Sequence, residues 1–177
     1  MVFGGCAPST PSAPVRVVDF IRELDHAEKR PPAGFTVASH EIDGVTRPVI
    51  TAAVPSRLTF ALPLPRHGVL RAFVAPAGPP APVRLRVGVS DDRIYEGLAE
   101  LTLVPGRPAW TDLRVDLSAY AGWKWSLFYR PDRTIWHLVL ATDPVDGAPA
   151  TLLWGTPEIV TDAASAREYA ARRQRLR

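Results

Sequence analysis

Trp110-Thr-Asp-Leu-Arg-Val-Asp-Leu-Ser-Ala-Tyr-Ala-Gly122 is the stretch of sequence that decides the fold of this chain. Apolar and polar residues alternate along it, so Val115 and Leu117 are expected to point inward at the end of a strand. The carboxylate of Asp116 can bond a nearby backbone amide and so form a turn. Tyr120 can then close the end of a sandwich. The stretch is therefore predicted to be a strand followed by a tight turn, with structural roles for its residues.

Alternating segments of the same kind occupy most of the chain on both sides of this stretch. Turn signals such as Asp43-Gly44, Pro105-Gly106 and Asp146-Gly147 separate them. Short strands without interleaved helices are typical of an antiparallel all-β jelly-roll sandwich, expected here over residues 33–161. The expected strands are residues 35–39, 45–53, 57–64, 68–75, 83–89, 99–104, 112–117, 123–130, 135–141 and 150–160.

Two segments outside this region show helical patterns. Val17, Phe20, Ile21 and Leu24 recur at helical spacing, which predicts an amphipathic helix over residues 15–29 within an N-terminal unit of residues 15–32. Pro31 and Pro32 would end this helix. The final residues, 162–177, are expected to form a basic tail with a short helix, because Ser165 and Glu168 have the spacing of a capping box.

The run Val115-Asp-Leu-Ser-Ala-Tyr-Ala-Gly122, together with Leu153-Trp-Gly-Thr-Pro-Glu-Ile159, resembles the galactose-binding-like jelly-roll domains. Such domains occur beside sulfatases and glycosidases and as carbohydrate-binding modules. The resemblance covers roughly residues 57–160 and implies the fold more strongly than any function. It also implies that a structural calcium is an open alternative, although no residue here matches a ligand motif of the family.

The composition excludes several classes of protein. Apolar residues make up 46% and charged residues 22% of the 177 residues, which is ordinary for a globular domain. The single cysteine rules out an internal disulfide and a multi-cysteine zinc site. The net charge of +3 equals the charge of the arginine-rich tail alone. No basic face for nucleic acid is therefore expected.

The single cysteine is Cys6, which lies between Phe3-Gly4-Gly5 and a Pro/Ser/Ala-rich run ending at Pro14. This setting resembles the acceptor site of a bacterial lipoprotein. It predicts lipid attachment at Cys6, a tether over residues 1–14, and a location in the cell envelope, periplasmic or on the outer face of a membrane. A signal peptide would need a basic and an apolar segment before Cys6. The alternative is a free thiol on a disordered terminus.

No catalytic constellation is evident in the sequence. The four histidines lack metal-binding spacing, and Ser90 is not followed by the glycine that a nucleophile elbow requires. The acidic pairs Asp91/Asp92 and Glu96/Glu100 are interpreted as solvated loop residues in preference to a calcium site. We therefore expect a protein that is not an enzyme and has no cofactor, with structural calcium as the open alternative.

The candidate contact residues are one aromatic and three basic side chains. Trp123 stands where the resembling family usually has a polar residue, which suggests a role in stacking on a sugar or packing on a protein. Core burial is the equally weighted alternative for Trp123, and it is the preferred interpretation for Trp125, Trp136 and Trp154. Arg172, Arg173 and Arg175 in the tail are the other predicted contacts.

Two functions are compatible with these features. The first is a non-catalytic, membrane-tethered interaction or assembly subunit of a cell-envelope or membrane protein complex. The alternative is a stand-alone carbohydrate-binding module with a glycan as its partner. The sequence favours the first, because the predicted tether, the extra helix and the arginine-rich tail all suit docking onto a partner. A hollow with an aromatic platform and converging polar groups would favour a glycan.

Overall fold

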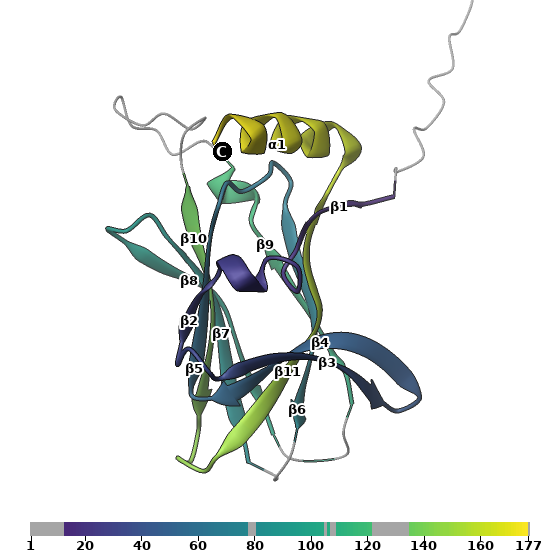
Figure 1. The fold of residues 1–177 in the computed structure, drawn as a ribbon, viewed down its shortest axis with the longest axis vertical. Helices are drawn as coiled ribbons and strands as arrows, with labels where there is room; N and C mark the ends of the chain where they lie inside the picture. Colours follow the sequence, from purple (N-terminus) through teal and green to yellow (C-terminus); the bar gives the residue numbers. More distant parts are fainter. Residues whose placement is uncertain (1–12, 78–80, 105, 107–108, 122–134, 177) are drawn as a thin grey trace, which may run out of the picture.

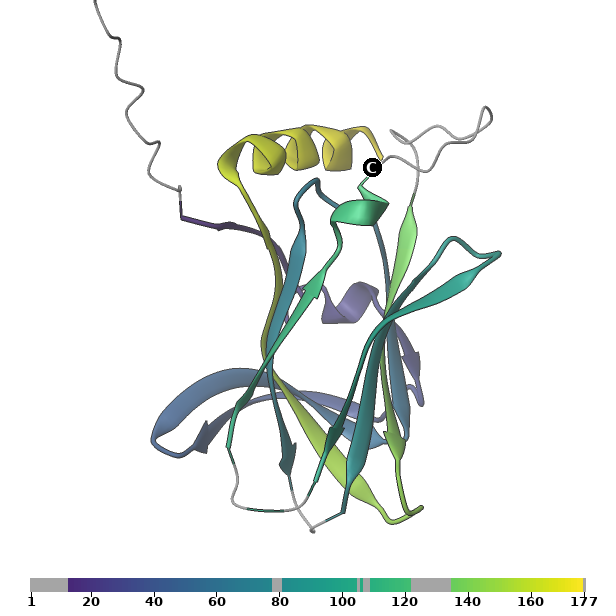
Figure 2. The same cartoon turned by 180° about the vertical axis from the view of Figure 1, so that it is seen from behind.

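The computed structural model describes residues 13–77, 81–104, 106, 109–121 and 135–176. Two antiparallel sheets pack face to face as a β-sandwich, and a helix lies across one end (Figures 1 and 2). The first sheet has six strands. In spatial order these are β3 (Phe35–Ile42), β4 (Val45–Val54), β11 (Ala150–Thr161), β6 (Val69–Ala77) and β9 (Thr111–Asp116), with β1 (Val15–Asp19) beside the end of β11.

The second sheet has five strands. In spatial order these are β2 (Glu28–Arg30), β5 (Ser56–Leu62), β10 (Trp136–Pro144), β7 (Val83–Ser90) and β8 (Tyr95–Leu103). Alternate residues of the two sheets meet in one apolar core, in which Trp154 is 1% and Trp136 7% exposed. The all-β antiparallel sandwich expected from the alternating sequence is confirmed, as is the burial of these two tryptophans. Trp125 lies outside the described residues, as does the predicted strand over residues 123–130.

The hairpin between β3 and β4 has the turn that the sequence predicted. Ile42 pairs with Val45, so the loop consists of Asp43 and Gly44 alone. Both loop residues have positive φ, 53° and 74°, as a type I′ turn requires. The positive φ values that Asp43 and Gly44 adopt at this point therefore set the register of the hairpin.

The predicted N-terminal helix over residues 15–29 is wrong. The segment instead forms β1, a turn, a 3₁₀ turn at Leu24–His26, and β2. β-branched residues at its start suit a strand, and β1 pairs with the second half of β11. The carboxylate of Asp19 then accepts hydrogen bonds from the backbone amides of Ile21 and Arg22, which turns the chain.

The apolar residues of this segment are nevertheless buried, as the pattern implied. Val18 is 3%, Phe20 0% and Leu24 6% exposed. The ring of Phe20 lies 4.5 Å from that of Phe60 on β5. The periodicity thus identified which residues pack on the core, but a turn can present side chains at the same intervals as a helix.

The Val115–Tyr120 motif has the structural roles expected of it. Val115 and Leu117 are buried, and Oδ1 of Asp116 accepts a hydrogen bond of 2.8 Å from the backbone amide of Ser118. Tyr120, in the 3₁₀ turn Ser118–Tyr120, packs edge-on against Trp136 at 5.3 Å. Burial, with a hydrogen bond to Glu96, raises the pKa of Tyr120 to about 12. The motif therefore closes one end of the sandwich.

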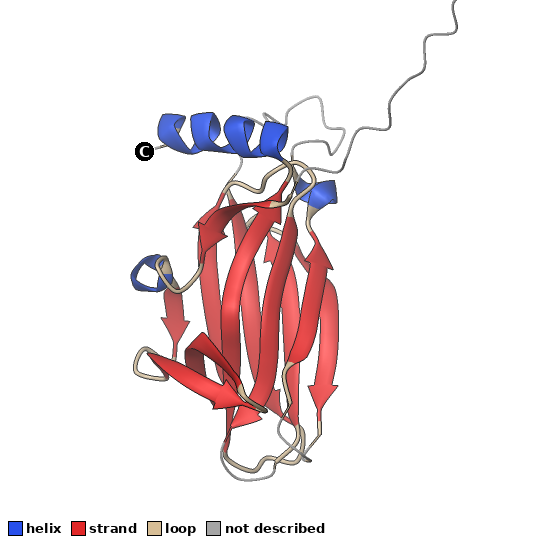
Figure 3. Ribbon diagram, turned by 90° about the vertical axis from the view of Figure 1, so that its right-hand side faces the viewer, coloured by secondary structure: helices blue, strands red, loops and turns tan. Residues whose placement is uncertain are grey.

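The C-terminal helix α1 (Ala163–Arg175) crosses the same end of the sandwich (Figure 3). Its expected presence is confirmed, but its N-cap is Asp162 and not Ser165. The Asp162 carboxylate accepts hydrogen bonds of 2.9 Å from the backbone amides of Ala164 and Ser165. Tyr169 packs into the core from the buried side of the helix and is 4% exposed. No helix among the described residues is long and apolar enough to cross a bilayer.

Candidate functional site

The outward face of the second sheet carries polar side chains over an apolar floor. Cross-strand partners in a sheet share a face, so the outward residues form rows across the strands. One row consists of Arg30, Arg57, Ala141, Arg86 and Glu100. The next consists of Glu28, Thr59, Val139, Gly88 and Gly97. A third contains Ala61, His137, Ser90 and Tyr95.

These rows enclose a hollow of about 410 Å³ that extends across the strands β2, β5, β10, β7 and β8. Val139 and Ala141 form part of its floor and are 6% and 4% exposed, although they point away from the core. Longer polar side chains surround them. A surface of this kind offers an apolar base with converging hydrogen-bonding groups, which is the usual composition of a small-molecule or sugar site.

Tyr95 forms one end of the hollow. It is 49% exposed, and its ring lies across Gly88 on the neighbouring strand. A β-carbon at Gly88 would lie 2.5 Å from Cζ of the ring, so only glycine permits this position. A tyrosine ring held at this end of the hollow can stack on an apolar ring, and its hydroxyl can hydrogen-bond to a ligand.

A polar group lies directly beside this tyrosine. Nδ1 of His137 is 2.7 Å from Oδ1 of Asp92, which fixes the imidazole at the edge of the hollow. The backbone amide of Asp92 donates a 3.2 Å hydrogen bond to the hydroxyl of Ser90. These contacts hold the β7–β8 turn against β10. They also orient the hydroxyl and imidazole groups that would meet a ligand.

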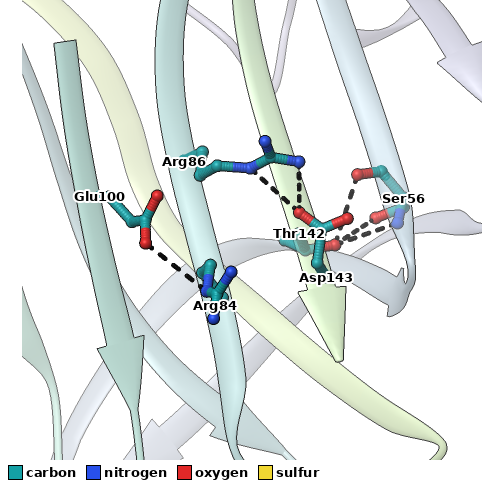
Figure 4. A network of polar contacts seen from close by, with 6 residues as sticks. All are labelled: Ser56, Arg84, Arg86, Glu100, Thr142 and Asp143. Carbon is teal, nitrogen blue, oxygen red and sulfur yellow. Dashed lines mark hydrogen bonds and ion pairs between the residues drawn. The ribbon is translucent and has the colours of Figure 1, made fainter. Parts of the chain in front are cut away.

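On the other side of the floor, Arg86 is held by Asp143. Nε and Nη2 of Arg86 donate hydrogen bonds of 3.1 and 2.6 Å to one carboxylate oxygen of Asp143 (Figure 4). This carboxylate raises the pKa of Arg86 further above its ordinary value, so the guanidinium is permanently charged. Below the same strands, Ser56 and Thr142 form a buried hydrogen bond of 2.8 Å that joins β5 to β10.

The acidic residues that were weighed as calcium ligands have other partners. Oδ1 of Asp91 accepts hydrogen bonds from the backbone amides of Arg93 and Ile94, and the bond from Ile94 is the main cause of the lowered pKa of Asp91. Asp92 contacts His137 as described above. In the part of the chain that the structure describes, no three His, Cys, Asp or Glu residues are placed to hold a metal. The presence of a structural calcium stays an open expectation.

The structure places the three predicted arginine contacts on α1, away from this hollow. Arg172 and Arg173 lie on α1 at the end of the sandwich, and both bond to this chain itself. Nη2 of Arg173 is 2.5 Å from the carboxylate of Glu23, and Nη1 of Arg172 donates a 3.4 Å hydrogen bond to the carbonyl of Leu64. Arg175 is exposed in the last turn of α1.

The other two predicted site residues, Cys6 and Trp123, lie outside the described residues. Lipid attachment at Cys6 and the contact roles of Trp123, Arg172, Arg173 and Arg175 stay predictions. A second hollow, of about 530 Å³, lies between the end of α1 and β5 and is lined by Phe20, Phe60 and Ile135 among others.

The outward face of the second sheet could not be recognised from the sequence. The strand expected to begin at Ala99 begins at Tyr95 as β8. The available signal was Tyr95, three residues after the Asp91-Asp92 turn, with glycines at positions 88 and 97. No local pattern indicates that these residues meet Arg57 and His137.

The structure resembles several solved structures, of which the first two below have TM-scores above 0.5. TmCBM61 in complex with β-1,4-galactotriose has a TM-score of 0.53 and 10% identity, covering 84% of this chain and 99% of that one. An exo-β-agarase has a TM-score of 0.51 and 10% identity over 88% of this chain, which spans about a quarter (26%) of the agarase chain. The CBM22-1 xylan-binding domain of Paenibacillus barcinonensis Xyn10C has a TM-score of 0.47 and 16% identity, covering 77% of this chain and 85% of that domain.

No family model matches the sequence, and no curated protein matches it in sequence. The structural likeness shows that this chain shares its galactose-binding-like jelly-roll fold with TmCBM61. The fold implied by the Val115–Gly122 and Leu153–Ile159 motifs is thus confirmed. At these levels of identity the likeness concerns the fold alone.

Proposed function

We propose that this protein is a non-catalytic carbohydrate-binding module that binds a polysaccharide across the outward face of the second sheet. The observation that carries this proposal is the ring of Tyr95, held over Gly88 beside a polar hollow. The fold shared with TmCBM61, over nearly the whole of that chain, supports it. A carbohydrate-binding module, the alternative inferred from the sequence, is therefore preferred to a membrane-tethered assembly subunit.

Docking onto a membrane complex has less support. That function was inferred from Cys6, Trp123 and the arginine-rich tail. Cys6 and Trp123 lie outside the described residues, and Arg172 and Arg173 are bonded within the chain. The amphipathic helix that was to pack on a partner is replaced by β1, a turn and β2, whose apolar residues pack on the protein's own core.

Affinity electrophoresis against soluble polysaccharides tests the proposed function directly. The panel contains β-1,4-galactan, agarose, xylan, polygalacturonate and carrageenan. We expect at least one polymer to retard the protein, and Tyr95→Ala to weaken that binding about ten-fold, since loss of aromatic stacking and its buried area is worth roughly 1.4 kcal/mol. Tyr95→Phe should retain most of the affinity, because the ring is kept.

The matched control is Val37→Ala, which truncates a 53% exposed side chain on β3 in the other sheet. It should bind as the unmodified protein does. Absence of retardation by every polymer, or equal retardation of the unmodified and Tyr95→Ala proteins, would contradict a polysaccharide site on this face.

A further inference from the structure

Three arginines lie in one row across the hollow. Arg30 on β2 pairs directly with Arg57 on β5, and Ala141 on β10 separates Arg57 from Arg86 on β7. Neighbouring strands are ~4.8 Å apart, so the backbones of Arg57 and Arg86 are separated by roughly 10 Å. The methyl group of Ala141 leaves the space between these two long side chains open.

The charges in this row are not evenly balanced. Nη2 of Arg30 is 2.5 Å from the carboxylate of Glu28, and Arg86 is held by Asp143 through Nε and Nη2. The contacts found among the described residues give Arg57 no carboxylate partner. Arg57 is exposed on β5 and lies opposite another arginine, an arrangement that is unfavourable for two like charges. An anion beside Arg57 would relieve this repulsion.

We propose that the hollow is specific for an acidic glycan, whose anionic group lies over Ala141 between Arg57 and Arg86. This inference rests on the proposed function and adds the chemical class of the ligand. The planar guanidinium of Arg57 matches a carboxylate in two parallel hydrogen bonds, and its charge strengthens them. Arg86 adds a second fixed charge. Tyr95, two rows away, would stack on a neighbouring part of the polymer.

The anion can be the carboxylate of a uronic acid or a sulfate ester, and the choice of polymer distinguishes them. Binding is measured by titration calorimetry with polygalacturonate, which is carboxylated, with carrageenan, which is sulfated, and with neutral β-1,4-galactan. We expect at least one acidic polymer to bind about ten-fold more tightly than galactan at low ionic strength. The preference should shrink as salt is added, because exposed charges are screened within ~10 Å at 0.1 M.

Arg57→Gln should lower the affinity for the acidic polymers far more than the affinity for galactan, and so remove most of this preference. The control Arg167→Gln removes the same charge from an exposed position on α1, away from the hollow, and should keep the preference. Thermal unfolding of both variants should match that of the unmodified protein. A preference that Arg167→Gln reduces as much as Arg57→Gln would overturn the proposal, because net charge would then account for it.

The binding measurements distinguish a wrong acidic specificity from a wrong glycan site. Galactan bound as tightly as both acidic polymers, with weaker binding in Tyr95→Ala, would overturn the acidic specificity and leave the glycan site in place. No binding of any polymer would overturn both. Preference for polygalacturonate assigns the anion as a carboxylate, and preference for carrageenan assigns it as a sulfate.

Discussion

The phenol ring of Tyr95 on β8 lies on the backbone of Gly88 on β7, and it covers that glycine although Gly88 faces away from the core. Gly88 is buried because the ring lies over it. The contact with Gly88 places the ring at one end of the polar hollow. The glycine is therefore part of the site even though it has no side chain to contribute.

Gly88→Ala should displace the ring of Tyr95, because the new β-carbon would lie 2.5 Å from Cζ. The ring is half exposed and can rotate into solvent, so we expect the free energy of unfolding to change by less than about 0.5 kcal/mol. Polysaccharide binding should fall as far as it does in Tyr95→Ala. Titration calorimetry and urea unfolding measure the two quantities.

Gly97→Ala is the control, since Gly97 lies directly opposite Gly88 and a β-carbon there meets no atom within 4 Å. Its affinity should equal that of the unmodified protein. Equal affinities for Gly88→Ala and Gly97→Ala would show that the position of the ring does not matter for binding.

Phe20→Ala should destabilise the fold by about 3–5 kcal/mol, as is usual for removal of a buried phenylalanine. Phe20 is fully buried and packs on Phe60 in the second sheet, so the segment after β1 joins the core. Val15→Ala, at a 38% exposed position of β1, should cost less than about 1 kcal/mol. Chemical unfolding monitored by tryptophan fluorescence measures the free energy of unfolding of both variants. Equal destabilisation by Phe20→Ala and Val15→Ala would mean that Phe20 does not pack in the core.

The strands could be predicted from the sequence where neighbouring residues alone determine the conformation of the chain. Asp43 and Gly44 supply the positive φ values of a two-residue turn, and the alternation on either side then determines which residues face the core. The burial of Trp154 follows from the same alternation. The N-terminal segment was predicted incorrectly because its apolar spacing fits both a helix and a strand followed by a turn. Pairing of β1 with β11, which is distant in the sequence, decides between them.

The candidate site could not be predicted, for a different reason. Arg30, Arg57 and Arg86 become neighbours only through the strand order β2-β5-β10-β7-β8. This order brings β10, late in the chain, between two earlier strands. Each arginine alone has the pattern of an ordinary outward residue on a strand, so nothing near it in the sequence marks it as part of a site. This face is formed by the pairing of strands that are distant in the sequence, and local periodicity does not reveal that pairing.

Thr142→Val should cost about 1–3 kcal/mol of stability, because it leaves buried polar groups without partners. Thr142 accepts a 3.1 Å hydrogen bond from the backbone amide of Ser56 and shares another of 2.8 Å with its hydroxyl. Both groups are buried between β5 and β10. Thr102→Val, at an exposed position on β8, should change stability by less than about 0.5 kcal/mol. If urea unfolding gives both variants the same midpoint, the buried pair does not stabilise the sandwich.

The last prediction concerns the cap of α1 and its dependence on pH. Hydrogen bonds from the amide and hydroxyl of Ser165 lower the pKa of Asp162. A lowered pKa in the folded state means that the charged carboxylate stabilises the fold. Its contribution is complete above the ordinary aspartate pKa of ~3.9 and is lost as the pH falls through the lowered value. Asp162→Ala should therefore unfold at a lower temperature than the unmodified protein at pH 7, and this difference should shrink on acidification from about pH 5 to pH 2.

Asp162→Asn keeps a good N-cap without a titrating group. Its unfolding temperature should therefore resemble that of the unmodified protein at pH 7 and exceed that of Asp162→Ala at every pH. Comparing variants at each pH removes the contribution of other carboxylates, such as Asp116, whose pKa is also lowered by Ser118. Calorimetric unfolding temperatures that differ by the same amount at all pH values would show that the charge of Asp162 has no part in capping the helix.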